Sequence, residues 1–292
     1  TLMRSSAASD VYKRQGGIME NQLQNGNRVW EDLLSELFRL NYEQQSRITA
    51  VEQKIYAALN KAPQQLEGLI TLMFAHIMLG NSSKAKSMAH KIWEIGGSLA
   101  PFFEQVYIQN LLNLGLIDMA KILLSPRIEQ LKDNIVFFYP SLVKYAVMTG
   151  DIPLLEQLGA FADVTAGDEV LYDFADLYES GNRREHFKNI QKLILEHSRE
   201  YLSSYEYELY DDRGFPELQI VLYVNYDNQF CSKMQQNITA KINAFWRSCG
   251  QEPLNNLSVI VENIRLHPSW DDSVESDELI LPSGDSADNW GL

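Results

Sequence analysis

The chain has 292 residues, with 25 Lys and Arg against 39 Asp and Glu, and its net charge is −14. Such an acidic chain repels phosphate backbones and anionic lipid surfaces, which disfavours general nucleic-acid binding and electrostatic membrane attachment. An apolar share of 45% is enough for a sizeable core in one long domain or two smaller ones, and no apolar run of about 18 residues predicts a membrane span.

The opening stretch TLMRSSAASDVYKRQ has no apolar period and no helix cap. Residues 5–15 back-translate codon by codon to a transposase adapter used in preparing sequencing libraries, and the segment resembles that adapter. We therefore expect residues 1–18 to be an adapter artefact and a disordered leader, with translation starting at Met19 or further upstream. The alternative is a genuine disordered leader.

Four glycines recur at nearly even spacing in the next part of the chain. Gly80, Gly115, Gly150 and Gly181 are separated by 35, 35 and 31 residues, and an amphipathic stretch precedes and follows each one. Glycine suits the left-handed position that ends a helix, and the Asn, Ser or Asp residues after it suit the cap of the next helix. The spacing predicts helix–turn–helix units; an irregular helical bundle is the alternative.

This pattern resembles the tetratricopeptide repeat, a unit of about 34 residues that stacks into a superhelix. The resemblance covers roughly residues 29–200. The residues that carry it are Gly80, Ala85 and Ala89, then Gly115 and Ala120, and, in an earlier unit, Val51, Ile55, Ala58 and Pro63. Three residues depart from the pattern: we expect Pro126 to interrupt one helix and Gly159 to weaken another, and His186 stands where a small residue is usual.

The resemblance implies a groove for a peptide or protein, and two known uses of such grooves can be tested on the residues. A clamp for an acidic C-terminus needs Lys and Asn on successive first helices. The corresponding positions here are Glu67, Ile70, Thr71, Phe74, Phe102, Gln105, Val106 and Gln109, which cannot form that clamp. A related helical repeat reads RNA through a basic groove, which this acidic chain does not favour.

In residues 201–268 the sequence pattern changes from helical to strand-like. SYEYELYDD and ELQIVLYVNYD flank the turn RGFP and predict an antiparallel hairpin, a helix follows at about 230–247, and LSVIVENIRL predicts a third strand. We expect this small β-β-α-β module to place Ile220, Leu222, Val259 and Val261 in its core and to pack against the last helical repeat. Cys231 and Cys249 lie near the two ends of the predicted helix, too far apart for a disulfide, which favours free thiols in the cytoplasm.

Residues 269–292 form an acidic tail without Lys or Arg, which predicts disorder. Trp270, Trp290 and the segment DELILP interrupt its polar background, so it is either a docking motif that orders on binding or a solubilising tail. A basic patch on a predicted helix, formed by Arg183, Arg184, Lys188, Lys192 and Arg199, either offsets nearby Glu residues or receives an acidic segment such as this tail.

Candidate catalytic residues are sparse. His186 and His197 share a helix face but lack a carboxylate or thiol at ligand spacing. Four carboxylates cluster in and after the first strand, where they can bind a divalent metal: Glu206, Glu208, Asp211 and Asp212. The lysine that usually accompanies such a site in a nuclease is missing from the neighbouring strand, and an exposed face of alternating Glu and Tyr explains the cluster without a metal.

The sequence therefore predicts a mainly α fold, an α-solenoid of helix–turn–helix repeats (residues 19–200) followed by the β-β-α-β module. We expect a cytoplasmic, non-enzymatic adaptor for a protein or peptide partner, with no cofactor, no metal and no membrane attachment. The candidate contact residues are Phe102, Tyr107, Tyr139, Trp270 and Trp290. The alternatives are an enzyme with a metal site at Glu206, Glu208 and Asp211, and an RNA-binding repeat protein.

Overall fold

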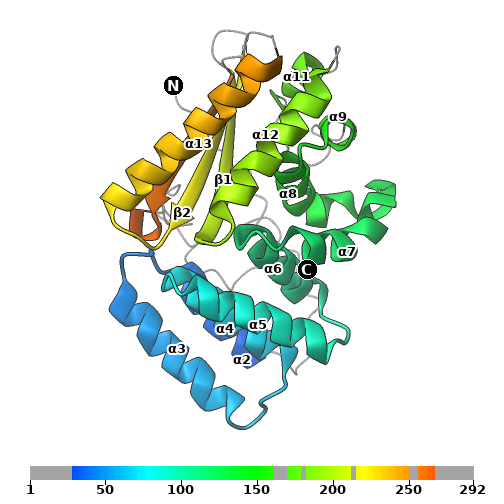
Figure 1. Ribbon diagram of the computed structural model, residues 1–292. Coiled ribbons are helices and arrows are strands. Elements are labelled where there is room, and N and C mark those ends of the chain that lie inside the picture. Colours follow the sequence, from blue (N-terminus) through cyan, green and yellow to red (C-terminus); the bar gives the residue numbers. More distant parts are fainter. Residues whose placement is uncertain are drawn as a thin grey trace, which may run out of the picture.

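The computed structural model describes residues 28–129, 131–160, 170–178, 182–211, 215–249 and 256–266, with backbone only at 131–136 and 211. Within these ranges the protein is mainly helical, with eleven α-helices and a small three-stranded sheet near the C-terminal end. Figure 1 shows the first helices below the sheet and the later ones beside it. None of the described helices combines the length and apolar character that a bilayer crossing needs.

Ten of the helices in the described ranges precede the sheet. They are α2 (Arg28–Phe38), α3 (Gln45–Leu59), α4 (Leu66–Met78), α5 (Ser82–Ile95), α6 (Pro101–Asn113), α7 (Ile117–Glu129), α8 (Leu131–Thr149), α9 (Ile152–Gly159), α11 (Val170–Leu177) and α12 (Arg183–Ser198). The pairs α4–α5, α6–α7 and α8–α9 pack together, and α6 also contacts α4 and α8. Because α4 and α6 are buried on nearly all sides, they form the centre of the helical part.

The turns after α4, α6 and α8 share one geometry. Gly80, Gly115 and Gly150 have φ of 70°, 70° and 65°, values that a residue with a Cβ rarely adopts. At each turn the glycine N–H donates to the carbonyl three residues earlier, and the next N–H donates to the carbonyl five residues earlier. These are the two bonds of the Schellman motif, which satisfy the last carbonyls of a helix. The fourth glycine, Gly181, lies outside the described residues.

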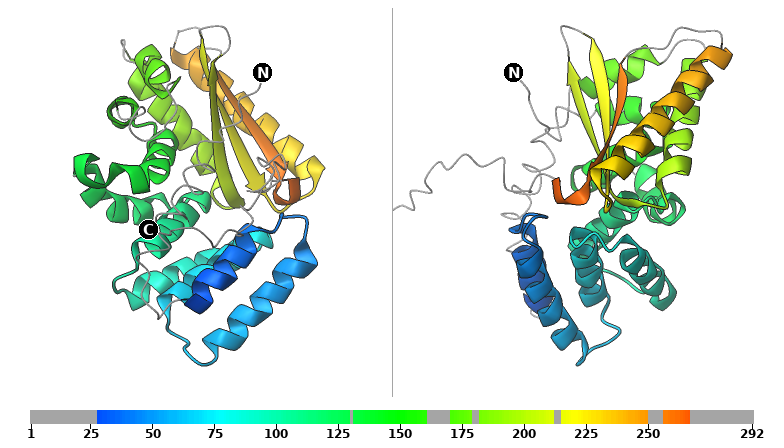
Figure 2. Two further views of the ribbon diagram at one scale, coloured as in Figure 1. Left: turned by 180° about the vertical axis from the view of Figure 1, so that it is seen from behind. Right: turned by 60° about the vertical axis from the view of Figure 1, so that its left-hand side comes forward.

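The C-terminal part has the predicted order strand, strand, helix, strand. Strand β1 (Leu202–Asp211) pairs antiparallel with β2 (Pro216–Val224), and β2 pairs parallel with β3 (Leu257–Asn263) after helix α13 (Asn228–Cys249). The expected third strand is shorter than the segment LSVIVENIRL, because Ile264–Leu266 form the 3-10 turn η1. Helix α13 crosses one face of the sheet and packs beside α12 (Figure 2).

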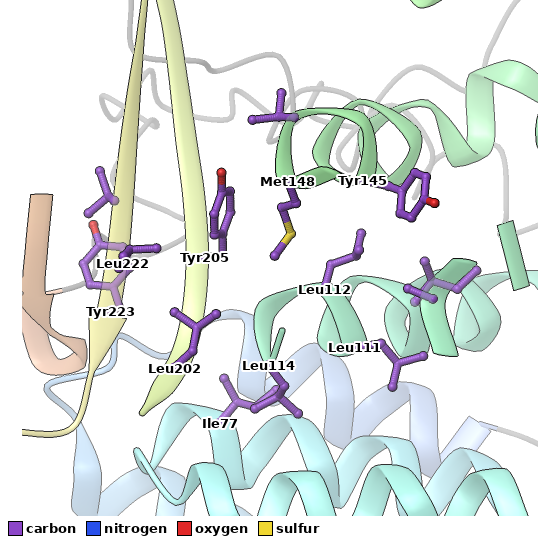
Figure 3. Packing of buried hydrophobic residues seen from close by; sticks show 14 of the residues in the cluster. Ile77, Leu111, Leu112, Leu114, Tyr145, Met148, Leu202, Tyr205, Leu222 and Tyr223 are labelled. Atoms are coloured by element: carbon purple, nitrogen blue, oxygen red, sulfur yellow. The ribbon is translucent and has the colours of Figure 1, made fainter. Parts of the chain in front are cut away.

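The C-terminal part contacts earlier helices as well as the last ones. Helices α11 and α12 contact it as expected, but β1 also packs on α6. Asn225, after β2, donates to the Gly80 carbonyl at 3.1 Å, and Lys86 of α5 donates to the Arg199 carbonyl at 2.5 Å. Figure 3 shows Leu202 beside Ile77 and Leu114. The expected contact with the last helices is therefore present, and the sheet also lies along the glycine turns of earlier helix pairs.

The three sequence departures have separate outcomes. Pro126 does not interrupt α7, because the helix continues to Glu129 and side-chain donors add hydrogen bonds around the proline. Ser125 Oγ donates to the Lys121 carbonyl at 2.7 Å, and Arg127 Nη1 donates to the Leu123 carbonyl at 2.8 Å. Helix α9 is short and ends at Gly159.

His186 is buried on α12. Its ring lies edge-on to Phe245 and Trp246 of α13, with centroid distances of 5.7 and 5.6 Å. A large residue fits at this position because its neighbour is α13, which leaves room for a ring.

Candidate functional site

The aromatic residues expected to contact a partner are mostly packed inside the fold. Tyr107 is 2% exposed and donates its hydroxyl to the Ala89 carbonyl at 2.9 Å, and burial raises the pKa of this phenol. Tyr139 is 6% exposed and donates to the Leu158 carbonyl at 3.3 Å. Phe102 is half-buried, with its ring edge-on to Phe103. Trp270 and Trp290 lie outside the described residues.

The faces of α4 and α6 that the repeat resemblance assigns to a ligand are also covered. Five of the eight positions compared with the peptide clamp are buried, and these are Ile70, Thr71, Phe74, Gln105 and Val106. Gln109 donates to Ser141 Oγ of α8 at 2.9 Å. Since β1 packs on α6 and α2 packs on α4, the chain itself occupies the space where a groove ligand would lie.

An open pocket lies on another side of the helical part, between α5, α6 and α7. Its volume is about 430 Å³, and its apolar walls come from Leu66, Ile92, Trp93, Leu99 and Leu123. The Trp93 side chain is 38% exposed, so one wall of the pocket faces solvent.

The path of the chain from α5 to α6 shapes this pocket. Helix α5 ends at Ile95, and its C-cap Gly96 has φ 63° and ψ −176°, a conformation that is nearly restricted to glycine. Gly97 follows with φ 120°, and Pro101 then begins α6. Trp93 before this pair of glycines and Leu99 after it both line the pocket. The sequence EIGGSLAP is the signal that sequence reasoning missed.

An ion pair also lines the pocket. Glu104, in the first turn of α6, accepts from Arg127 Nη2 of α7 at 2.6 Å. The guanidinium also lies 4.7 Å from the centroid of the Phe138 ring, within the range of a cation–π contact. The two charged side chains are 25% and 19% exposed, for Arg127 and Glu104 respectively. They can therefore orient a polar group of a bound molecule while the walls hold an apolar one.

The polar groups of this pocket are few. They are Ser98, the Glu104–Arg127 pair and Tyr107, whose hydroxyl donates to the Ala89 carbonyl. An apolar cleft with a few oriented polar groups is typical of a binding site.

The carboxylates considered for a metal site do not converge on a common point in the described residues. Glu206 accepts from Ser204 Oγ at 3.0 Å and from Lys144 Nζ of α8 at 3.1 Å. Glu208 lies on the same face of β1, and the Asp211 side chain is outside the description. Across the described ranges no three His, Cys, Asp or Glu side chains are close enough to share a metal ion.

The lysine partner of Glu206 comes from a helix, whereas sequence reasoning sought it on a strand. Lys144 is 4% exposed and also donates to Asn113 Oδ1 of α6 at 2.5 Å. Burial lowers the pKa of Lys144, and the Glu206 carboxylate opposes that shift. The ammonium thus ties α8 to α6 and to β1.

We expect Lys144→Met to lower the free energy of unfolding by about 2 kcal/mol, because Asn113 and Glu206 each lose a donor in a largely dry interface. Glu206→Gln should cost less, since this side chain is 31% exposed. The two residues belong to one network, so their effects should not add. The double variant should lose less free energy of unfolding than the sum of the two single losses, by at least about 1 kcal/mol. Urea unfolding of the four proteins measures this coupling, and additive losses would show that the pair does not stabilise the junction.

The basic residues of α12 are largely engaged within the fold. Arg184 pairs with Glu156 of α9 at 2.8 Å, and Lys192 lies 3.9 Å from Glu196. Arg183 donates to the Leu177 carbonyl at 3.0 Å. These contacts favour the interpretation that the patch offsets nearby carboxylates. His197 Nδ1 lies 2.9 Å from the Leu193 carbonyl of its own helix, so the two histidines are not a paired site.

Comparison with known proteins gave no match. No family model matches the chain, and no curated protein or solved structure is significantly similar to it. Functional inference for this protein therefore rests on its own residues.

Proposed function

We propose that the chain is a non-enzymatic adaptor whose helical hairpins stack as tetratricopeptide-like repeats and bind a peptide segment of a protein partner. The binding site that best supports this role is the pocket between α5, α6 and α7. The observation that carries the proposal is the exposed Trp93 wall beside an apolar cleft that the Glu104–Arg127 pair also lines. Trp and Arg are the residue types that most often dominate binding energy at protein interfaces.

The chemistry of the pocket defines the peptide that would fit. Its volume accommodates one or two apolar side chains against Trp93, Leu99 and Leu123. Beside them, the ion pair offers a carboxylate and a guanidinium, which suits a neighbouring backbone amide or polar side chain. The expected ligand is therefore a short segment with an apolar anchor followed by a hydrogen-bonding group.

A reducing, cytoplasmic location belongs to the same proposal. Cys231 lies in the first turn of α13 and Cys249 is its last residue, and both thiols are unpaired. Unpaired cysteines at the two ends of a helix are usual in proteins of reducing compartments.

The experiment is selection of a random peptide library on the full chain, followed by affinity measurement with variants. Trp93→Ala should lower the affinity for the selected peptides about 30-fold or more, the loss expected for a central interface residue. Tyr172→Ala is the matched control, because Tyr172 is an exposed aromatic residue of α11 away from the pocket, 54% exposed. A library that yields no binder, or peptides that bind Trp93→Ala as well as the unchanged chain, would overturn the proposal.

A further inference from the structure

A second groove runs along the edge of the sheet, between β3 and α13. Strand β3 is at the end of the strand order, so one side of its backbone has no neighbouring strand in the described part of the chain. The groove has a volume of about 710 Å³ and ends at Leu266, which is 58% exposed. Exposed strand edges offer unpaired N–H and C=O groups, and proteins usually cover them.

The side of α13 that lines this groove is uncharged and rich in hydrogen-bonding groups. It carries Ser232, Gln235, Gln236, Thr239 and Asn243. Gln235 Oε1 already accepts from the Val261 N–H of β3 at 3.1 Å, so these side chains reach the strand edge. Amide and hydroxyl side chains of this kind can pair with the backbone of an extended segment.

Basic residues of α13 flank the groove on its outer side, while Glu262 of β3 is the charged residue within its lining. Helix α13 contains Lys233, Lys241 and Arg247 and no acidic residue, in a chain whose net charge is −14. Lys233 and Arg247 stand seven residues before and after Ala240, which lines the groove, so all three follow one stripe of the helix. Lys241 lies on the opposite side of the helix, about 170° from the middle of the lined face.

We propose that this groove holds the chain's own C-terminal segment, residues 267–292, in extended form. The segment starts where Leu266 meets the groove, and its 26 residues carry seven acidic side chains without Lys or Arg. At about 3.3 Å per residue they reach several times the length of β3. The proposal adds to the adaptor function, and its surface does not overlap the α5–α6–α7 pocket.

The spacing of charges matches along the groove. Lys233 and Arg247 are 14 residues apart on α13, which corresponds to about 21 Å at 1.5 Å per residue. Asp271 and Asp277 are six residues apart, which corresponds to about 20 Å in an extended chain. A segment that leaves Leu266 and runs antiparallel to β3 passes Lys233 first and Arg247 second, and so brings Asp271 and Asp277 to them.

A glutamate-specific protease acting on the full chain tests this docking, because cleavage after Glu275 requires the segment to leave the groove. The variant Lys233→Glu with Arg247→Glu should be cut about tenfold faster at low salt, the effect of losing two ion pairs at the upper end of the surface range. Adding Asp271→Lys and Asp277→Lys to that variant should restore slow cleavage. The control, Lys121→Glu with Lys241→Glu, changes the net charge equally and should leave the rate unchanged.

Each alternative outcome has a defined meaning. Equal cleavage of the unchanged chain and of the Lys233→Glu, Arg247→Glu variant would overturn the proposal, as would equal acceleration in the control. A cleavage rate that rises on dilution would assign the segment to a second copy, which also overturns docking within one chain. Thermal unfolding of each variant at the same salt checks that the fold is intact. None of these results depends on the peptide selection that tests the adaptor function.

Discussion

Gly150→Ala should lower the free energy of unfolding by about 2–5 kcal/mol, the largest effect we expect from a single methyl group in this protein. The left-handed conformation at φ 65° costs a residue with a Cβ about 1–2 kcal/mol. The added Cβ would also lie 2.5 Å from Lys188 Cα and 2.8 Å from Lys188 N of α12. Backbone atoms cannot move aside as a flexible side chain can, so overpacking adds about 1–3 kcal/mol.

Gly115→Ala is the matched control for this prediction. Gly115 ends α6 with the same hydrogen-bond pattern and φ 70°, but its added Cβ would meet Arg199 Cβ at 3.4 Å, which is an ordinary contact distance. It should therefore cost only the conformational part, about 1–2 kcal/mol. Urea unfolding of both variants measures the difference. Equal losses at the two positions would show that α12 does not press on the turn after α8.

The glycine turns also show how far sequence reasoning reaches. Gly80, Gly115 and Gly150 were predicted to end helices because a local pattern of apolar stretches, glycine and capping residues determines that geometry. Sequence reasoning did not predict that the same turns receive Asn225, which follows β2, and Arg199 and Lys188, which belong to α12 and its C-cap. Those contacts join residues 38 to 145 positions apart, and no local pattern encodes them.

The same limit applies to the candidate binding residues. An aromatic residue on an amphipathic helix can serve a neighbouring helix or a partner, and spacing alone does not separate the two roles. Tyr107 is buried because its hydroxyl reaches the Ala89 carbonyl of the preceding helix. Trp93 lies two residues before the end of α5, and it remains 38% exposed although the chain after Gly96 and Gly97 lines the same pocket. Burial in this fold depends on where the chain goes next.

Coverage of α6 by β1 changes which face of the repeats is available to a ligand. The resemblance assigns ligand binding to the first helices, yet Gln105 and Val106 are buried, and Asn113 binds Lys144 beside Glu206 of β1. A groove ligand would have to displace the hairpin and break that network. The pocket beside Trp93 requires no such rearrangement, which is why the proposed function uses it.

Lowering the pH from 7 towards 4 should destabilise the protein by up to about 3 kcal/mol through His76 alone. His76 is 2% exposed on α4, and burial, with a smaller contribution from the Lys84 ammonium, lowers its pKa from 6.5 to about 4. The folded protein thus holds the ring neutral, while the unfolded chain binds a proton below pH 6.5. Stability is therefore full above pH 6.5 and is lost as the pH falls towards 4, at up to about 1.4 kcal/mol per pH unit.

The Glu52 carboxylate opposes this shift, and its position decides the outcome. Glu52 Oε1 lies 3.1 Å from His76 Nδ1, but that nitrogen makes no hydrogen bond within the described residues. Burial of the ring outweighs the nearby carboxylate, so the pKa of His76 is lowered.

The variant His76→Gln isolates this contribution. Glutamine stays neutral at every pH, so the variant should lose some packing at pH 7 and become the more stable protein near pH 4.5. His90→Gln, an exposed substitution on α5, should follow the unchanged chain throughout. Urea unfolding from pH 4 to pH 8 measures the three curves. If His76→Gln instead falls with the unchanged chain between pH 6.5 and 4, then Glu52 keeps the ring charged in the folded state, and the acid sensitivity of the protein comes from its carboxylates.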